Sequence, residues 1–141
     1  MAANILERNR NTMKQFETAI NTANVELANE LIASDAKFYT PASPEPLTGG
    51  KGYLSIVFWM RSGFSDVQWK LDEIICEEKK CAVRWILTGT HDGEFLGVKP
   101  TKQKIQSTFL NFYYFNDEGK IINDVAGEGL LGILKPLGLT K

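Results

Sequence analysis

The sequence is poor in the residues from which metal sites and disulfide scaffolds are built. Its 141 residues include one histidine, His91, and two cysteines, Cys76 and Cys81. One imidazole cannot form the HExxH site of the zinc proteases, and two cysteines cannot form a four-cysteine zinc site. The cysteines flank Glu-Glu-Lys-Lys, a segment typical of a hairpin turn, so we expect two reduced thiols that face each other across two strands. No metal ligand set is predicted.

Sequence motifs for nucleotide binding and serine hydrolysis are absent as well. The chain has no GxGxxG fingerprint, no phosphate-binding loop of the GxxxxGK[ST] type and no GxSxG elbow. Sixteen basic residues against seventeen acidic ones give a net charge of −1, which favours neither nucleic acid nor an anionic membrane as a partner. No apolar run approaches the ~20 residues of a membrane span. The polar first eleven residues lack the apolar core of a signal peptide, so we expect a cytoplasmic protein.

The residues that are abundant indicate one globular domain over residues 1–141. Hydrophobic residues make up 43% of the chain, which is enough for a single core. Apolar residues recur at helical spacing over residues 13–20, again after the candidate N-cap Asn24, and a third time over residues 53–60. Residues 41–50 contain three prolines and two glycines, which predicts an ordered loop or lid before the third helix.

The second half of the chain changes to the period of a β-strand. Four β-rich runs are predicted at residues 67–71, 81–91, 105–115 and 120–126, followed by a short helix at about residues 130–134. Helices first and antiparallel strands afterwards predict an α+β domain. We expect the N-terminal helices to cover one face of a strongly bent, mostly antiparallel sheet and to enclose a cone that holds a small-molecule pocket.

One segment resembles a known family. Residues 89–101, Gly-Thr-His-Asp-Gly-Glu-Phe-Leu-Gly-Val-Lys-Pro-Thr, are similar to a pattern of the SnoaL-like polyketide cyclases. Phe64-Ser65-Asp66 lies upstream of this segment, and Gly119-Lys120-Ile121 and the leucine-rich end lie downstream, all in the family's order, so the resemblance covers about residues 10 to 138. It implies the cone-shaped α+β barrel also found in ketosteroid isomerase and scytalone dehydratase. It further implies a homodimer packed through the open face of the sheet.

The resemblance also implies a type of chemistry. Cyclases of this family close a ring by an intramolecular aldol step, in which a base removes a proton from a carbon flanked by carbonyls and a donor stabilises the enolate. They need no metal or cofactor. In this chain the family's catalytic aspartate and histidine fall on Ala126 and Asn111, neither of which can transfer a proton.

The alternation of side chains along the last strand indicates a replacement base. If residue 126 faces the pocket, then Asp124 and Ile122 face it too. A carboxyl group between apolar neighbours is partly desolvated, which raises its pKa and suits a general base. We therefore predict Asp124 as the catalytic acid/base, with Glu128, just beyond the strand, as a second acid.

The preceding strand is expected to supply hydrogen-bond donors and apolar walls. Because side chains alternate along a strand, the residues that share a face with Asn111 are Ser107, Phe109, Tyr113 and Phe115. Asn111 and Tyr113 are candidates to stabilise an oxyanion, and Phe109 and Phe115 to form walls. Trp59, at the end of the third helix, and Tyr39, beside the proline-rich loop, are expected to close the mouth. The alternative for these aromatic residues is an ordinary core.

Two functions of different classes remain open from the sequence. The first is a cofactor-independent cyclase or isomerase that acts on a small, apolar, polyketide-like carbonyl compound. The second is a non-catalytic module that binds a hydrophobic small molecule or mediates dimerisation. A carboxylate beside two donors at the floor of the pocket would favour the enzyme, and an apolar floor would favour the binding module. Hydroxylation or hydrolysis of the substrate cannot be separated from cyclisation by the sequence.

Overall fold

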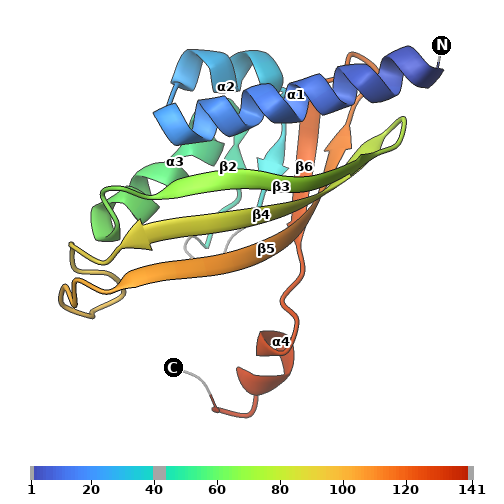
Figure 1. Cartoon of the computed structure of the whole chain (residues 1–141). Coiled ribbons are helices and arrows are strands. Elements are labelled where there is room, and N and C mark those ends of the chain that lie inside the picture. Colours follow the sequence, from blue (N-terminus) through green and yellow to red (C-terminus); the bar gives the residue numbers. More distant parts are fainter. Residues whose placement is uncertain (1, 40–43, 140–141) are drawn as a thin grey trace.

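The computed structural model describes residues 2–39 and 44–139 and has a layer of helices against a four-stranded sheet (Figure 1). The helices of that layer are α1 (Ala2–Thr22), α2 (Val25–Leu31) and α3 (Gly49–Gly63). The sheet is antiparallel in the order β3-β4-β5-β6, with strands β3 (Gln68–Cys76), β4 (Lys80–Thr90), β5 (Lys104–Phe115) and β6 (Ile121–Ala126). Strands β1 (Lys37–Phe38) and β2 (Leu47–Thr48) form a separate pair, and α4 (Leu131–Leu134) follows β6. The predicted α+β class is confirmed.

The helices form because their apolar stripes can be buried against the sheet. In α1, Met13, Phe16 and Ile20 recur at intervals of three and four residues and belong to the main core. The predicted N-cap of α2 is confirmed, since the side chain of Asn24 accepts a hydrogen bond of 3.0 Å from the backbone N–H of Leu27. No helix in the described residues has the length and hydrophobicity needed to cross a membrane.

Strands β4, β5 and β6 lie within one residue of their predicted positions, whereas β3 continues five residues beyond the predicted run at 67–71. Along β4 the odd-numbered residues Cys81, Val83, Trp85 and Leu87 are buried, whereas Arg84 between them is exposed. The hairpin between β3 and β4 places Cys76 directly opposite Cys81, as predicted, and both are free and buried. Burial raises the pKa of the Cys81 thiol, and the hydrogen bond with Cys76 acts in the same direction.

The expected closed cone is not confirmed. The described strands form an open sheet with β3 and β6 at its edges, and the β1–β2 pair is a sheet of its own. Beside the far edge of the sheet, Ile32 at the end of α2 forms an isolated parallel β-bridge with Ile121 of β6. The predicted loop at residues 41–50 is shorter than expected, because β2 occupies residues 47–48 and α3 begins at Gly49. Residues 40–43 lie outside the described residues.

Candidate functional site

A cavity of about 300 Å³ lies between the helical layer and the face of the sheet that the helices cover. We call it the inner cavity. Its walls are mostly apolar, with Ile56, Val57 and Met60 from α3 and Trp69, Trp85 and Leu87 from the sheet. Its polar lining consists of Tyr53, Asn111, Tyr113 and Asp124, together with the mouth residue Tyr39. Among the residues that the structure describes, the lining therefore contains one carboxyl group and no lysine, arginine or histidine.

Asp124 is the centre of the polar end of the inner cavity. Its Oδ1 accepts a hydrogen bond of 2.7 Å from the Asn111 side-chain amide, and its Oδ2 accepts one of 2.8 Å from the Tyr53 hydroxyl. The two donors come from β5 and α3, which lie on different sides of the cavity. Both oxygens of the carboxylate are therefore held in place, one from the sheet and one from the helices.

Tyr113 extends this network into the core. It lies opposite Asp124 in the register of β5 and β6, is 1% exposed, and its hydroxyl accepts a hydrogen bond of 2.9 Å from Trp85 Nε1. Trp85 donates to the tyrosine oxygen, and the nearby Tyr113 hydroxyl acts to lower the pKa of Asp124. The floor of the cavity is thus a linked set of donors around one carboxyl group.

Burial and hydrogen bonding act in opposite directions on the pKa of Asp124. Burial raises the pKa of Asp124, and the hydrogen bonds from Asn111, Tyr53 and Tyr113 oppose this effect without cancelling it. Burial also raises the pKa of both tyrosines, and the nearby Asp124 charge raises it further. The tyrosines therefore stay protonated, and the carboxyl group is the member of this set that is suited to exchange a proton.

The structure brings most of the predicted site residues to this cavity. Its lining includes six of them, namely Tyr39, Trp59, Phe109, Asn111, Tyr113 and Asp124. Exposure increases from the floor toward the mouth, since Tyr113 is 1% exposed, Trp59 37% and Tyr39 78%. Trp59 and Tyr39 are thus among the exposed members of the lining, and their role in closing the mouth stays a prediction.

Four residues considered in the sequence analysis do not line the inner cavity, and one of them is Ser107, which is exposed on β5. Phe115 is buried in the main core, and Glu128 is exposed on the segment after β6. The expectation that Ile122 faces the cavity is wrong, because a β-bulge interrupts the alternation of β6. Phe115 pairs with Ile121 and Tyr114 with Asn123, so Ile122 is the extra residue.

Tyr53 is a site residue that was not predicted from the sequence. It belongs to the apolar stripe of the third helix, where Val57 and Met60 follow at helical spacing and also line the cavity. A tyrosine hydroxyl on a helix face that packs against the core needs a buried hydrogen-bond partner. This requirement was the feature of the sequence that could have indicated a polar site near Tyr53. The same reasoning applies to Trp85 and Tyr113, because each is an aromatic residue with a polar group on a predicted strand and therefore needs a partner when it is buried.

His91 lies outside the inner cavity. Its Nδ1 is 2.9 Å from the Thr101 hydroxyl, and its ring packs on Phe64 with the centroids 5.3 Å apart. Across residues 2–39 and 44–139, no group of three or more His, Cys, Asp or Glu side chains could hold a metal ion. The chemistry available to the site is therefore that of the carboxyl, hydroxyl and amide groups around Asp124.

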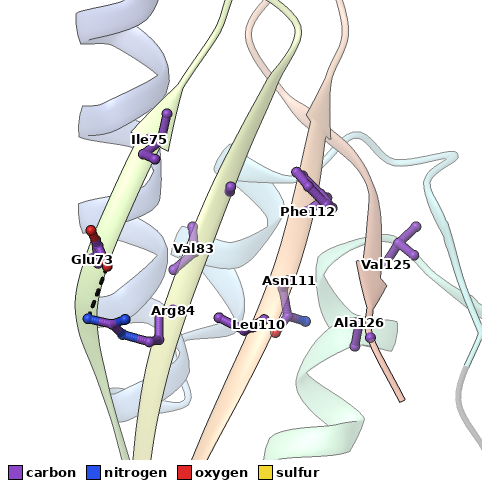
Figure 2. A pocket seen from close by; sticks show the side chains of 11 residues that line it. Glu73, Ile75, Val83, Arg84, Leu110, Asn111, Phe112, Val125 and Ala126 are labelled. Atoms are coloured by element: carbon purple, nitrogen blue, oxygen red, sulfur yellow. Dashed lines mark ion pairs between the residues drawn. The ribbon is translucent and has the colours of Figure 1, made fainter. Parts of the chain in front are cut away.

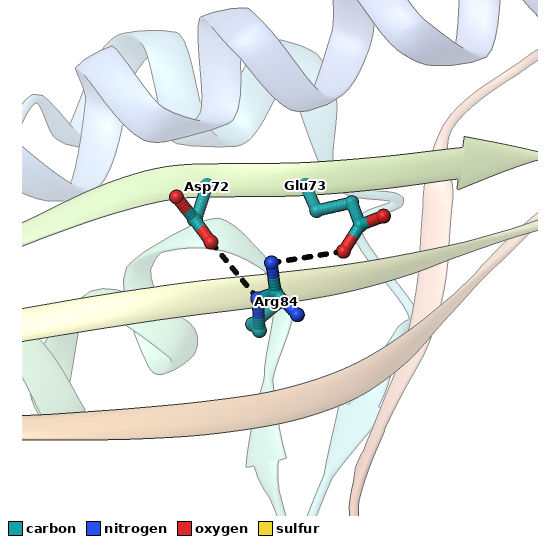
Figure 3. A network of polar contacts seen from close by, with 3 residues as sticks. All are labelled: Asp72, Glu73 and Arg84. Atoms are coloured by element: carbon teal, nitrogen blue, oxygen red, sulfur yellow. Dashed lines mark hydrogen bonds and ion pairs between the residues drawn. The ribbon is translucent and has the colours of Figure 1, made fainter.

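A second hollow of about 570 Å³ lies on the opposite face of the sheet, and we call it the outer groove (Figure 2). Its apolar lining includes Ile75, Leu110, Phe112 and Val125. Its charged residues are Glu73 and Arg84, whose atoms Oε2 and Nη2 are 3.0 Å apart; Arg84 Nε also lies 2.9 Å from Asp72 Oδ2 (Figure 3). These charges are exposed and compensate one another.

Comparison with known proteins agrees with this geometry. The family model of SnoaL-like polyketide cyclases matches residues 10–137. Nogalonic acid methyl ester cyclase from Streptomyces nogalater is 30% identical over 125 residues, which cover 86% of this chain and 90% of that one.

Solved structures show the same fold. IdmH from Streptomyces antibioticus, a proposed polyketide cyclase, is 27% identical, with a TM-score of 0.73 over 92% of this chain and 98% of that one. TsrD from Streptomyces laurentii is 19% identical, with a TM-score of 0.75 over 95% of this chain and 97% of that one, and this likeness shows the fold alone.

Proposed function

This chain belongs to the SnoaL-like polyketide cyclase family, and from that premise we propose that it is a cofactor-independent cyclase or isomerase acting on a small apolar carbonyl compound. One observation carries the proposal. At the closed end of an apolar cavity, a single carboxyl group with a raised pKa accepts hydrogen bonds from two donors, Asn111 and Tyr53. An apolar floor would have favoured a binding module instead.

The proposed reaction begins with removal of a proton by Asp124. The proton comes from a carbon flanked by carbonyls, which is acidic enough for a carboxylate to deprotonate it. Asn111 and Tyr53 are donors that can turn from the carboxylate to the oxygen on which the enolate charge develops. The enolate carbon then attacks a second carbonyl of the same molecule, and the resulting alkoxide takes back the proton that Asp124 holds. The ring closes with no net gain or loss of protons.

In this chain the proposed base lies one inward-facing position earlier on β6 than the catalytic aspartate of the family. The family's catalytic aspartate corresponds to Ala126, which also lines the inner cavity but carries no ionisable group. Asp124 lies two residues earlier on the same face of the strand. Ala126 leaves space beside it, and Asn111 replaces an imidazole with a neutral donor.

We propose that the reaction needs no metal. The cavity lining offers one carboxylate and no histidine or cysteine, which is too few ligands for a zinc or calcium site. The substrate is expected to be uncharged near Asp124, because no cation lines the cavity to hold an anion. The two free thiols fit a reducing compartment such as the cytoplasm.

The test is proton exchange at the acidic carbon of a bound ligand. A panel of cyclic ketones and polyketide-type β-keto esters is incubated with the protein in deuterated buffer, and loss of the α-proton signal is followed by NMR. We expect exchange faster than in buffer, abolished when a tight non-exchanging ketone fills the cavity. Binding without accelerated exchange would support the non-catalytic binding module. Exchange that stops on chelator treatment would contradict the metal-free reaction.

A further inference from the structure

The loop between β4 and β5, residues 91–103, takes no part in the chemistry at Asp124. It lies beside the C-terminal end of α3 (Figure 1). Its tip is a two-residue turn, closed by backbone hydrogen bonds in both directions between Phe95 and Val98. Phe95 is half-buried, whereas Leu96 beside it is 76% exposed. Phe95 is therefore the apolar side chain that the tip turns toward the rest of the molecule.

Two glycines allow this loop to lie directly on the end of α3. A Cβ atom at Gly93 would overlap the carbonyl oxygen of Ser62. A Cβ atom at Gly63 would lie 2.6 Å from the ring of Phe95. The backbone N–H groups of Asp92 and Gly93 donate hydrogen bonds of 3.1 and 3.0 Å to the Gly63 carbonyl. The loop is thereby held against the helix, and Phe95 is held with it.

Phe95 connects the loop to the inner cavity through Trp59. The centroids of these two rings are 4.6 Å apart, at an interplanar angle of 42°. Phe95 also packs edge-on against Phe64, with the centroids 5.2 Å apart. Trp59 lines the inner cavity, whereas Phe95 does not line it. Phe95 can therefore influence a bound ligand only through the residues that it holds in place.

The lining of the inner cavity rests on two separate cores. Tyr113 and Trp85, at the polar end, belong to the main core. Leu87 belongs to a second, smaller core, against which Met60 and Phe95 pack. Leu87 and Met60 line the cavity, and Phe95 supports this part of the lining from the loop. Loss of the Phe95 ring would therefore loosen the apolar part of the lining and leave the polar end in place.

We propose that Phe95 is a positioning residue, which fixes the indole of Trp59 and thereby sets the size of the ring system that the inner cavity accepts. Because Trp69, Trp85 and Phe109 also line the cavity, the ligands are planar aromatic compounds, and because none of the described lining residues is a cation, they are uncharged. Without the Phe95 ring, Trp59 turns more freely, which weakens its contact with a small ring system and makes room for a larger one. The inference deepens the proposed function, on which it rests for the statement that the ligand is a substrate.

The mobility of Trp59 can be measured without any ligand. The chain has three tryptophans, so a nitrogen-labelled sample gives three indole N–H resonances, and Trp59→Phe identifies its own by loss. Phe95→Leu keeps an apolar side chain in the second core and removes the ring. We expect it to lower the NMR order parameter of the Trp59 indole and to leave those of Trp69 and Trp85 unchanged. Leu96→Ala is the matched control and should change none of them. An unchanged Trp59 order parameter in Phe95→Leu would overturn the proposal.

The selectivity for ring size gives the second measurement. α-Tetralone, with two fused rings, and anthrone, with three, are titrated by calorimetry into wild type and Phe95→Leu. We expect the ratio of the anthrone affinity to the α-tetralone affinity to rise by about 2–10-fold in the variant, which is the range of one aromatic pair. Leu96→Ala should keep the wild-type ratio. In a Trp59→Ala background, Phe95→Leu should no longer change the ratio, because Phe95 acts through Trp59.

These measurements separate the positioning role from the proposed chemistry. An unchanged ratio in Phe95→Leu, the same rise in the Trp59→Ala background, or a wild-type protein that binds neither ketone would overturn the positioning role. None of the readouts requires turnover. A raised ratio in a protein that does not accelerate proton exchange at the bound ketone would support the positioning of Trp59 by Phe95 and contradict the catalytic role of Asp124.

Discussion

The two faces of the sheet are built from the same strands and carry different chemistry. Along β5, Asn111 and Tyr113 point into the inner cavity, whereas Leu110 and Phe112 point into the outer groove. The outer groove is the larger, about 570 Å³ against 300 Å³, yet its charged groups are exposed and paired with one another. Of these two hollows, as lined by the described residues, the inner cavity is the one that holds a buried carboxyl group, that of Asp124. The size of an apolar hollow therefore says less about reactivity than the burial of one titratable group at its end.

Removing the inner carboxylate should have the largest effect. Asp124→Asn keeps the shape and hydrogen-bonding capacity of the side chain but cannot accept a proton, so turnover should fall by about 10²–10⁴-fold. Steady-state kinetics with a substrate found by proton exchange provides the measurement. Asp117→Asn, in the exposed turn after β5, is the matched control and should retain wild-type turnover. An Asp124→Asn variant with the wild-type rate would show that the base lies elsewhere, with Glu128→Gln as the next variant to measure.

Neighbouring residues on opposite faces should differ sharply in their contribution to stability. Tyr113 is buried and hydrogen-bonded to Trp85, so Tyr113→Ala should lower the free energy of unfolding by about 3–5 kcal/mol. Phe112, the next residue toward the N-terminus, is 48% exposed, and Phe112→Ala should cost less than about 1 kcal/mol when the protein is dilute enough to be monomeric. Urea denaturation of both variants measures the difference. Equal losses would mean that the outer face is packed in the single chain.

Tyr53→Phe should reduce turnover less than Asp124→Asn does and should also shift its pH dependence. Loss of one donor to a developing oxyanion is expected to cost about 10²-fold in kcat. The Tyr53 hydrogen bond lowers the pKa of Asp124, so its removal raises that pKa and moves the acid limb of the pH–rate profile to higher pH. Asn111→Ala should shift the limb in the same direction, because its amide has the same effect. A reduced rate with an unmoved acid limb would restrict Tyr53 to a structural role.

The smallest effect should be on the pH dependence of stability. The pKa of Asp124 is higher in the folded chain than in the unfolded one, so folding favours the protonated form. Its contribution to the free energy of unfolding is complete below about pH 4, decreases as the pH rises through the folded pKa, and is constant above it. Relative to wild type, Asp124→Asn should therefore gain stability from pH 4 upward and then level off, as measured by urea denaturation.

Comparing wild type with Asp124→Asn separates the pH dependence that is due to Asp124 from that of the other carboxyl groups. The pKa of Asp66 is lowered by hydrogen bonds from Thr90, and that of Asp92 by hydrogen bonds from Ser65. Both groups change stability with pH in the opposite direction, but equally in wild type and variant. If the free energy of unfolding of Asp124→Asn minus that of wild type decreased as the pH rises, the raised pKa of Asp124 would be contradicted.

Local patterns in the sequence were sufficient for the elements and for one side of the site. Strand alternation placed Asn111, Tyr113 and Asp124 in a single cavity, because consecutive inward positions of paired strands are necessarily neighbours. The same rule failed at Ile122, where a bulge inserts a residue that no side-chain pattern announces.

Contacts between distant segments could not be predicted from such patterns. Tyr53 meets Asp124 across 71 positions of the chain, and only the packing of α3 over the sheet brings the two together. The closed cone was expected from the bend of the sheet and from family resemblance, whereas the described strands leave both edges open. How far a sheet closes depends on the sum of strand twist and register, which single residues do not determine.

The order of the strands has a consequence for how this chain folds. Because β3, β4, β5 and β6 are adjacent in both sequence and space, each pairing is a local hairpin, and only the docking of the N-terminal helices closes a long loop. Tyr53, the helical partner of Asp124, arrives with that docking step, and so does most of the burial around the carboxyl group. The ionisation of Asp124 is therefore a reporter of when the two layers meet. A refolding reaction followed in weakly buffered indicator dye should take up a proton in the phase in which α3 reaches the sheet, and not in the earlier phase in which the hairpins form.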